Sequence, residues 1–444
     1  MDILKNLIIG IIISIIAIAG LYHLYVDDEL SPDARKWIEY YSKSTNLTGN
    51  AFIELIALSS DNTISTSQAK TLYKTKLGEI KNGFLEHSQQ LKYPNVDGLP
   101  DIYGNDEEYF CEFNNDNCLY ETAENRAAIE KILSKFSLIT QQYRALSKLT
   151  NFSPLNSIAT SPDWDQLATI QRLVILTVYF HILDNNLEKA ATQLSQLMTI
   201  DRHLLRTASD AIFHVTPIVN FKLYYQPMLV RLKHEGFTNW EMFEDSLKPL
   251  THNDLSMNRM WLRSFAIDTR AIQFNYIAVK DENINFFDTF QAKLKYKENM
   301  TFNSMFEYYK LQLIPDNAKK EELIALVNIA EKAATNSYEE QRNDLNNMFM
   351  FNIKNYKNIV GAYLELTASP KFLSLYENKF ELDLRLMLLN IMIHQDETPL
   401  EEVITLKQNK NPYTGEAPKL SGSQLCYQIL EIETCINVKR TTKA

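Results

Sequence analysis

The residues best suited to forming a bond or a metal site together are four cysteines, which fall into two pairs close in the sequence. Six residues separate Cys111 from Cys118, and eight separate Cys426 from Cys435. Four cysteines allow three pairings, and nearness along the chain favours 111 with 118 and 426 with 435. The competing use is a zinc site, which prefers C-x2-C-like pairs with histidine nearby. The spacing therefore predicts two local disulfides, formed in an oxidising compartment, that pin local structure.

A second candidate for chemistry is a serine motif, but the pattern around it is incomplete. Ser67-Gln68-Ala69-Lys70 fits the S-x-x-K motif of periplasmic serine acyl-enzymes, and Ser60-Asp61-Asn62 supplies an S-D-N. The two motifs stand in the reverse of the order that this chemistry uses, and no K-T-G follows. We therefore interpret Ser67 as a capping or helix-surface serine. The chain also lacks a G-x-S-x-G, an H-E-x-x-H, a Walker loop and a G-x-G-x-x-G.

Two sets of candidate metal ligands have the wrong spacing. His203 and His214, with Asp210 between them, would lie about 16 Å apart along one helix, too far to share an ion. Several acids precede or lie within the first cysteine loop: Asp106, Glu107, Glu108, Glu112 and Asp116. They lack the D-x-D-x-D-G order of a calcium loop. We expect no metal and no cofactor, although an acid and a base contributed by distant helices would leave no local signature.

The N-terminal segment predicts how the chain is positioned. Leu7 to Val26 is an apolar run long enough, at about 30 Å, for one membrane span. Lys5 before it and the acidic Asp27-Asp28-Glu29 after it predict an N-in orientation with the bulk of the chain in the periplasm. The competing interpretation is a signal peptide cleaved after Ala17-Ile18-Ala19. Because the apolar run continues to Val26, we expect a single-pass anchor of the bacterial inner membrane.

Composition and charge restrict the partners. The net charge is −10, and the basic residues are scattered, which argues against binding to nucleic acid or to an anionic lipid surface. The sequence contains 23 tyrosines and 22 phenylalanines but only 11 glycines and 13 prolines. This composition favours long helices over a turn-rich β protein. We therefore expect a mainly α fold: an anchor over 1–26, a multi-helix array of antiparallel helix pairs over 27–405 with a weak boundary near 235–250, and a small β appendix over 406–444.

Local patterns place the helices and strands of this array. Ser31-Pro32-Asp33 should begin the first helix after the anchor, Pro217 should begin another, and Thr238-Asn239-Trp240-Glu241 reads as a capping box. Apolar residues recur at helical spacing from Ile129 to Leu146. The segments 166–183 and 187–209 predict a helical hairpin, since Asp184-Asn185-Asn186 is turn chemistry. Further predicted elements are helices at 255–279, 301–313, 319–335, 338–366 and 382–394, and strands at 425–432 and 435–438.

The hairpin at 166–209 resembles a tetratricopeptide unit, a helix pair that binds peptides. Ala190, Leu194 and Leu197 occupy the expected positions of its second helix. The match is partial, because Val178 and Arg202 stand where a glycine and a closing proline are expected and no second copy follows at a period of 34. A generic antiparallel helix pair is therefore the other interpretation. We expect an envelope protein partner to bind the helical region around residues 125–235, with this hairpin as a possible interaction site.

The order of features along nearly the whole chain resembles a group of proteobacterial single-pass, mainly helical envelope proteins. The resemblance rests on the N-terminal span, the loop from Cys111 to Cys118 followed by Leu119, Tyr143-Arg144-Ala145-Leu146, the helix pair at 166–209, and Asn411-Pro412-Tyr413-Thr414-Gly415. It implies membrane anchorage and a helical outer domain. No activity and no site residue come with it.

Two functional classes are compatible with these features. The first is a non-enzymatic, membrane-anchored periplasmic scaffold or protein-interaction module. The second is an envelope enzyme, or a small-ligand or lipid-binding protein, with a pocket between helices. A groove lined by exposed aromatic side chains would favour the first class. A closed pocket with converging acids and histidines would favour the second.

Overall fold

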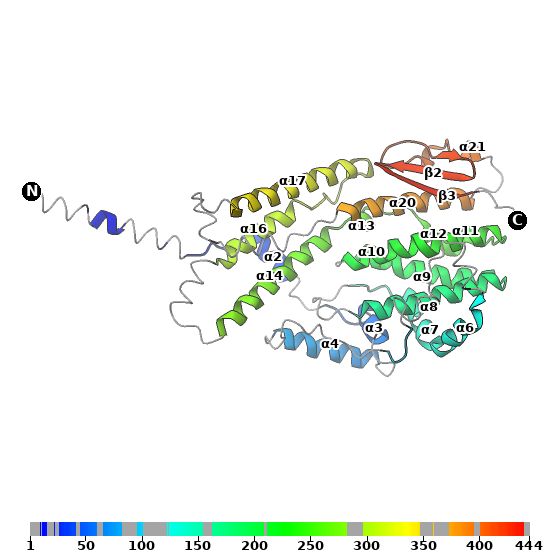
Figure 1. Ribbon diagram of the computed structural model, residues 1–444, viewed down its shortest axis with the longest axis horizontal. Helices are drawn as coiled ribbons and strands as arrows, with labels where there is room; N and C mark the ends of the chain where they lie inside the picture. Colours follow the sequence, from blue (N-terminus) through cyan, green and yellow to red (C-terminus); the bar gives the residue numbers. More distant parts are fainter. Residues whose placement is uncertain are drawn as a thin grey trace, which may run out of the picture. The chain divides into compact units, whose positions relative to one another are not determined.

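The computed structural model divides the chain into two compact units (Figure 1). Unit 1 comprises Met1–Lys43, Trp261–Ile314 and Leu326–Lys371, and unit 2 comprises Ser44–Met260, Pro315–Ala325 and Phe372–Ala444. Structure is described for residues 9, 11–15, 22, 26–40, 45–59, 65–81, 96–100, 122, 124–153, 162–207, 211–281, 296–346, 358, 373–394 and 400–438. These residues are mainly helical, as the sequence predicts, with a small antiparallel sheet near the C-terminus.

The passage between the units falls inside a helix. α14 (Asn258–Asp281) begins in unit 2 and continues in unit 1 after Met260. The sequence pointed instead to a weak boundary at 235–250, where turn chemistry is concentrated. Since a helix can connect two packed units without any break in its hydrogen bonding, this passage carries no turn signal in the sequence.

Unit 2 contains most of the helices and all three strands. Its helices before α14 are α3 (Ala51–Leu58), α4 (Thr66–Lys81), α6 (Arg126–Lys135), α7 (Ser137–Ala145), α8 (Trp164–Leu183), α9 (Leu187–Thr207), α10 (Ala211–Asn220), α11 (Gln226–His234), α12 (Glu244–Leu247) and α13 (His252–Leu255). Later in the chain come α20 (Leu373–His394) and α21 (Leu400–Val403). The helical repeat from Ile129 to Leu146 is interrupted at Phe136, so that α6 and α7 form in place of one helix.

α8 and α9 form the helical hairpin that the sequence predicts (Figure 1). The Asp163 side chain caps α8 by accepting a hydrogen bond from the Gln166 backbone N–H. The turn is made possible by Asn185, whose φ of 58° is a conformation that asparagine tolerates. Among the described helices, only α8 is long and apolar enough to cross a membrane. However, 67% of the apolar 18-residue stretch of this helix is buried inside the protein.

The chain after α9 keeps helical structure through a proline. α10 continues through a π-helical turn at Phe221–Tyr225 into α11. The prediction that a helix begins at Pro217 was wrong, since Pro217 is buried inside α10. A proline inside a helix removes one backbone hydrogen bond, and packing of α10 against α9 and α20 keeps the segment helical all the same.

The capping box predicted at Thr238 does not form. The segment Trp240–Phe243 is a short 3-10 turn whose N-cap, Asn239, makes no side-chain capping bond. A capping box forms instead at the start of α13, where Thr251 and Asp254 exchange the two bonds. Aromatic contacts account for the 3-10 turn, because the rings of Trp240 and Phe243 both lie against Phe237.

The C-terminal sheet is an antiparallel meander ordered β1 (Lys419–Ser421), β2 (Gln424–Ile429) and β3 (Ile432–Asn437). Cys426 and Cys435 are directly opposed in the β2–β3 register and form a disulfide, as predicted. Both strands pack on α20, so this sheet belongs to the same compact unit as the helices (Figure 1). The predicted β appendix is therefore present as structure, but it is part of the core of unit 2.

Unit 1 is organised around aromatic contacts between α14 and α16 (Glu298–Lys310). The rings of Phe265 and Phe306 lie with centroids 5.2 Å apart, and the Tyr309 hydroxyl donates to the Asp268 carboxylate. The other helices are α2 (Pro32–Tyr40) and α17 (Lys320–Asn346), which begins in unit 2 and runs through the break predicted near 336. α2 begins at Pro32 as predicted, and the Ser31 hydroxyl accepts a hydrogen bond from the Ala34 N–H.

Candidate functional site

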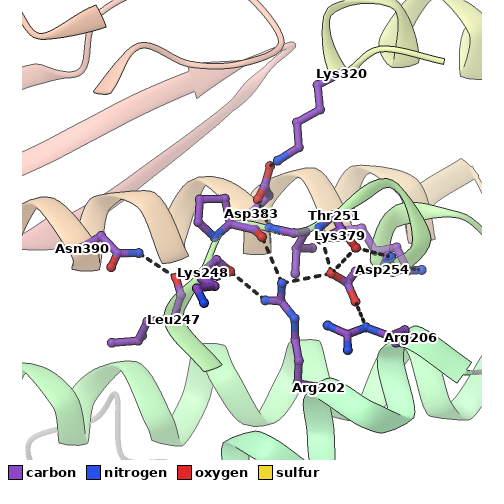
Figure 2. A network of polar contacts seen from close by, with 12 residues as sticks. Arg202, Arg206, Leu247, Lys248, Thr251, Asp254, Lys320, Lys379, Asp383 and Asn390 are labelled. Carbon is purple, nitrogen blue, oxygen red and sulfur yellow. Dashed lines mark hydrogen bonds and ion pairs between the residues drawn. The ribbon is translucent and has the colours of Figure 1, made fainter. Parts of the chain in front are cut away.

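Charged side chains meet in the interior of unit 2, where α9, α13 and α20 come together. Arg202, on α9, donates to the Lys248 and Pro249 carbonyls at 2.8 and 2.9 Å and to the Asp254 carboxylate at 2.9 Å (Figure 2). Arg206, one turn later, donates to the other oxygen of Asp254 at 3.0 Å. The Asp254 side chain has no exposed surface. Both arginines therefore hold α13 against α9, and Arg202 also holds the segment before α13.

Local structure fixes the carboxylate that the arginines bind. Asp254 is the third residue of α13, and it accepts hydrogen bonds from the backbone N–H and the hydroxyl of Thr251, each at 2.7 Å. Burial alone would raise the pKa of Asp254, but the charge of Arg202 and the bonds from Thr251 outweigh it, so the pKa lies below its ordinary value. Asp254 is thus an ionised carboxylate with every strong acceptor position occupied.

Lys379 reaches the other end of α13 from α20. Its ammonium group donates to the carbonyl oxygens of Asp254, Leu255 and Ser256 at 2.8, 3.3 and 3.3 Å (Figure 2). These are carbonyls that a helix C-terminus leaves without helical partners. Burial lowers the pKa of Lys379 to about 7, with the Asp254 charge opposing. The buried His214 has its pKa lowered by burial and by the charge of Lys379.

Asp383, one turn after Lys379, is a second buried carboxylate that joins three parts of unit 2. It accepts from the Leu250 N–H, from the Lys320 ammonium at 2.6 Å and from the Tyr413 hydroxyl at 2.8 Å. Its side chain has no exposed surface, while that of Lys320 is 25% exposed. Asp383 therefore fastens the 248–256 segment, the start of α17 and the turn before the sheet to α20.

Asp201, next to Arg202 on α9, lies in a separate buried cluster without a cation. Its carboxylate accepts from Gln171 at 3.0 Å, Asn220 at 2.9 Å and Tyr225 at 2.8 Å. Burial raises the pKa of Asp201 to about 6, against the lowering effect of these three donors. The cavity beside it measures only about 30 Å³, well below the size of a ligand pocket.

The described part of unit 2 also contains an open cleft of about 490 Å³, which we call the Trp240 cleft. Its walls come from the 238–249 segment, the last turns of α20 and the 3-10 turn Lys407–Asn409. The residues that line it are Thr238, Trp240, Glu241, Glu244, Leu247, Lys248, Pro249, Met387, Asn390, Ile393, His394, Gln408 and Asn409. The Asn390 amide donates to the Leu247 carbonyl at 2.6 Å and so ties two walls together (Figure 2).

The three hairpin residues singled out in the sequence lie inside the protein. Ala190, Leu194 and Leu197 have no exposed surface. They hold α9 in the core, so a partner could contact the hairpin only through other residues. A tetratricopeptide-like hairpin buries these positions to pair its own helices, which is why the pattern says nothing of a partner surface.

Those of the other sequence candidates that the structure describes are not brought together. His203 stacks on Phe152 with ring centroids 4.8 Å apart, whereas His214 is buried on a different helix, α10. Ser67 is exposed on α4. Cys111 and Cys118, the acids from Asp106 to Asp116, Ser60-Asp61-Asn62 and Asp210 lie outside the described residues.

Sequence analysis missed the residues of the charged interior, although one signal was available. α20 is buried on most sides, yet it carries Lys379, Glu381, Asp383 and Arg385 among its apolar residues. Charged side chains on such a helix must find partners inside the protein. Their partners could not be named, because Asp383 pairs with residues 63 and 30 positions away.

Comparison with known proteins adds no assignment. The chain matches no protein-family model, no curated protein and no solved structure. The chemistry of the described residues is therefore the only basis for a functional conclusion.

Proposed function

We propose that the chain is a membrane-tethered, extracytoplasmic scaffold that binds a segment of a protein partner in the Trp240 cleft. The observation that carries the proposal is a contrast within unit 2. The buried charges are occupied by internal partners, whereas the cleft is open and of ligand size. The polar interior serves to hold the 238–256 segment rigidly, and that segment forms one wall of the cleft.

The lining of the cleft favours a partner segment that carries a basic side chain beside an apolar one. Trp240 offers a half-buried ring, and the exposed Glu241 makes no ion pair among the described residues. Glu244, by contrast, lies 3.4 Å from the Lys248 ammonium. An indole beside a carboxylate attracts a lysine or arginine side chain. Leu247, Met387 and Ile393 supply the apolar floor.

The alternative, an enzyme with a site between helices, has less support in the described residues. His203 and His214 do not converge, and the carboxylates of Asp201, Asp254 and Asp383 are buried and do not line the cleft. Asp201 has the raised pKa of a proton-transfer group, but no cavity of substrate size adjoins it. We therefore place binding, rather than catalysis, first.

Membrane tethering is supported by the predicted span at 7–26. Of this segment, residues 9, 11–15, 22 and 26 are described, and all of them except Val26 are helical. Its described isoleucines are exposed, with values such as 61% at Ile13 and 60% at Ile15. An exposed helix of such residues is costly in water and suits a bilayer. An N-in orientation would place both units in the periplasm.

A photo-crosslinking amino acid at position 408 of the full-length protein, an exposed position in the cleft lining, tests the cleft in its native membrane and leaves Trp240 in place. We expect a discrete crosslinked partner that Glu241→Lys abolishes, because the substitution places a positive charge against the basic side chain. Glu431→Lys, an exposed acid in the β2–β3 turn, is the matched control and should keep the crosslink.

The same crosslinker at Leu138, which is 66% exposed on α7, reports on contact away from the cleft. Equal crosslinking at positions 138 and 408, or a crosslink at 408 that survives Glu241→Lys, would contradict a specific basic partner. Deletion of the 166–209 hairpin is not a usable test, since it would remove the core of unit 2.

A further inference from the structure

The segment that follows the predicted span is fastened to the first turn of α16. The Asp27 carboxylate accepts hydrogen bonds from the backbone N–H of Asn299 at 2.9 Å and of Met300 at 3.2 Å. These N–H groups belong to the start of a helix and have no helical acceptor of their own. Asp27 therefore caps α16 from a position some 270 residues earlier in the chain.

Two asparagines of α16 complete the attachment by binding the backbone of the same segment. The Asn299 amide donates to the Asp28 carbonyl, and the Asn303 amide donates to the Glu29 carbonyl, each at 2.9 Å. The Asn303 side-chain oxygen in turn accepts from the Ser31 N–H at 2.8 Å. We call these contacts between residues 27–31 and 299–303 the α16 clamp.

The clamp joins the segment to a packed body. α16 buries Phe302, Met305 and Phe306 in unit 1, and Phe306 packs against Phe265 of α14. A segment held by five hydrogen bonds to such a helix cannot act as a free linker. Unclamped, five extended residues would span roughly 17 Å.

No spare residue lies between the clamp and the apolar run. The run ends at Val26, and the clamp begins at Asp27. The Val26 N–H donates to the Tyr22 carbonyl at 2.9 Å, the i to i−4 bond of an α-helix. Val26, which makes this bond, immediately precedes the clamp.

We infer that the α16 clamp seats unit 1 directly on the lipid headgroups of the bilayer, with the start of α16 at the membrane surface. The inference rests on the proposed membrane tether and adds that the tether has no slack. Asp28 and Glu29 are exposed at this point, so the contact depends on the covalent anchor and not on attraction to anionic lipid. A scaffold seated in this way holds unit 1 at a fixed height above the bilayer.

Energy transfer to the bilayer surface tests the inference in the full-length protein. The chain is placed in nanodiscs of phosphatidylcholine with a headgroup-attached acceptor, and a donor dye is attached through an azido amino acid at the exposed position 307 of α16. We expect strong transfer in the unmodified chain and a loss of transfer in Asp27→Ala/Asn303→Ala. Glu29→Ala is the matched control, since only its backbone carbonyl takes part in the clamp.

The outcomes separate the clamp from the tether. Suppose that the protein floats with membranes, but that energy transfer is weak in the unmodified chain or equal in the unmodified chain and the double variant. The clamp then does not seat unit 1 on the bilayer, so the inference fails while the proposed tether stands. If the protein does not float with membranes, the proposed tether fails and takes the inference with it. Unchanged exchange of the Phe306 amide hydrogen in the double variant shows that its loss of transfer does not reflect unfolding of unit 1.

Discussion

Asp201 and Asp254 are buried carboxylates on neighbouring elements of unit 2, and their surroundings shift their pKa values in opposite directions. Asp254 faces Arg202 and Arg206, whose charges hold its pKa below the ordinary value despite burial. Asp201 has only neutral donors, so burial raises its pKa to about 6. Protonation of Asp254 on acidification destabilises the fold, whereas protonation of Asp201 stabilises it.

Asp201→Asn should change how stability depends on pH. With a folded-state pKa near 6 and an ordinary value of 3.8, the folded protein binds the proton more tightly than the unfolded chain. The stability that Asp201 contributes is therefore present below pH 4 and is lost as pH rises to about 6, by about 3 kcal/mol at most. Urea unfolding of detergent-solubilised protein at pH 4 to 7 should show this fall in the parent chain and a flatter profile in Asp201→Asn. Identical profiles would contradict it, and Asp165→Asn, an exposed aspartate on α8, is the control.

Arg202→Ala and Arg206→Ala form a matched pair at the Asp254 carboxylate. The Arg202 side chain is 9% exposed and makes three hydrogen bonds, whereas that of Arg206 is 44% exposed and makes one. Arg202→Ala leaves the buried Asp254 charge without its buried partner and should lower the free energy of unfolding by about 3 kcal/mol or more. Arg206→Ala removes a half-exposed partner and should lower it by about 1 kcal/mol or less. Urea unfolding measures both. Equal costs would show that Asp254 is not fixed by Arg202.

At the scale of elements, the sequence predicts what is decided locally. The α8–α9 hairpin follows from Asp184-Asn185-Asn186, because each of these residues favours a turn by itself. The capping box predicted at Thr238 also rests on a local sequence pattern, but it does not form, because packing of the Trp240 ring on Phe237 competes with it. The box at Thr251 was overlooked because its third residue is an aspartate, Asp254, and not the usual glutamate.

The charged interior and the Trp240 cleft could not be predicted, because their residues come from distant parts of the chain. Asn390 meets Leu247 across 143 residues, and Lys379 meets Asp254 across 125. Periodicity predicts that α20 is buried, but it does not say which element covers which side. The same limit applies to the α16 clamp. The sequence indicates only that Asp27 is an acidic residue that flanks the apolar run, whereas in the structure its carboxylate caps α16.

Cys435→Ser should loosen the sheet more than the helices. The disulfide closes a loop of nine residues by sequence separation, and its loss should cost roughly 2 to 3 kcal/mol by loop entropy. Because Tyr413 still binds Asp383 and β2 still packs on α20, we expect faster amide hydrogen exchange in β2 and β3 and little change in α8. Uniformly faster exchange in unit 2 would show that the disulfide holds the whole unit.

The predicted disulfide between Cys111 and Cys118 is open to a direct test. Non-reducing peptide mapping of protein taken from membranes should yield two linked peptides, 111 with 118 and 426 with 435. The expectation follows from the near pairing of all four cysteines and from an oxidising compartment. Free thiols at 111 and 118, or linkage of either to 426 or 435, would contradict the pairing.

At the scale of the whole molecule, the two proposals assign different tasks to the two units. Unit 1 contains the clamp that follows the predicted span, and unit 2 contains the cleft. Attachment to the bilayer and recognition of a partner would then be separable by mutation. Asp27→Ala/Asn303→Ala should leave the position 408 crosslink in place, and Glu241→Lys should leave energy transfer from position 307 unchanged.

The state of the mature N-terminus decides whether any tether exists. We expect intact-mass measurement of membrane-extracted protein to show residues 7–26 still attached, because the apolar run passes the Ala17-Ile18-Ala19 site and continues to Val26, which suits a stop in the bilayer better than cleavage. Ala19→Leu removes the small residue that a signal peptidase requires, so its mass should differ from the parent only by the substitution. A parent chain that begins at Gly20, with the longer chain restored by Ala19→Leu, would replace the anchor by a cleaved signal and release both units into the periplasm.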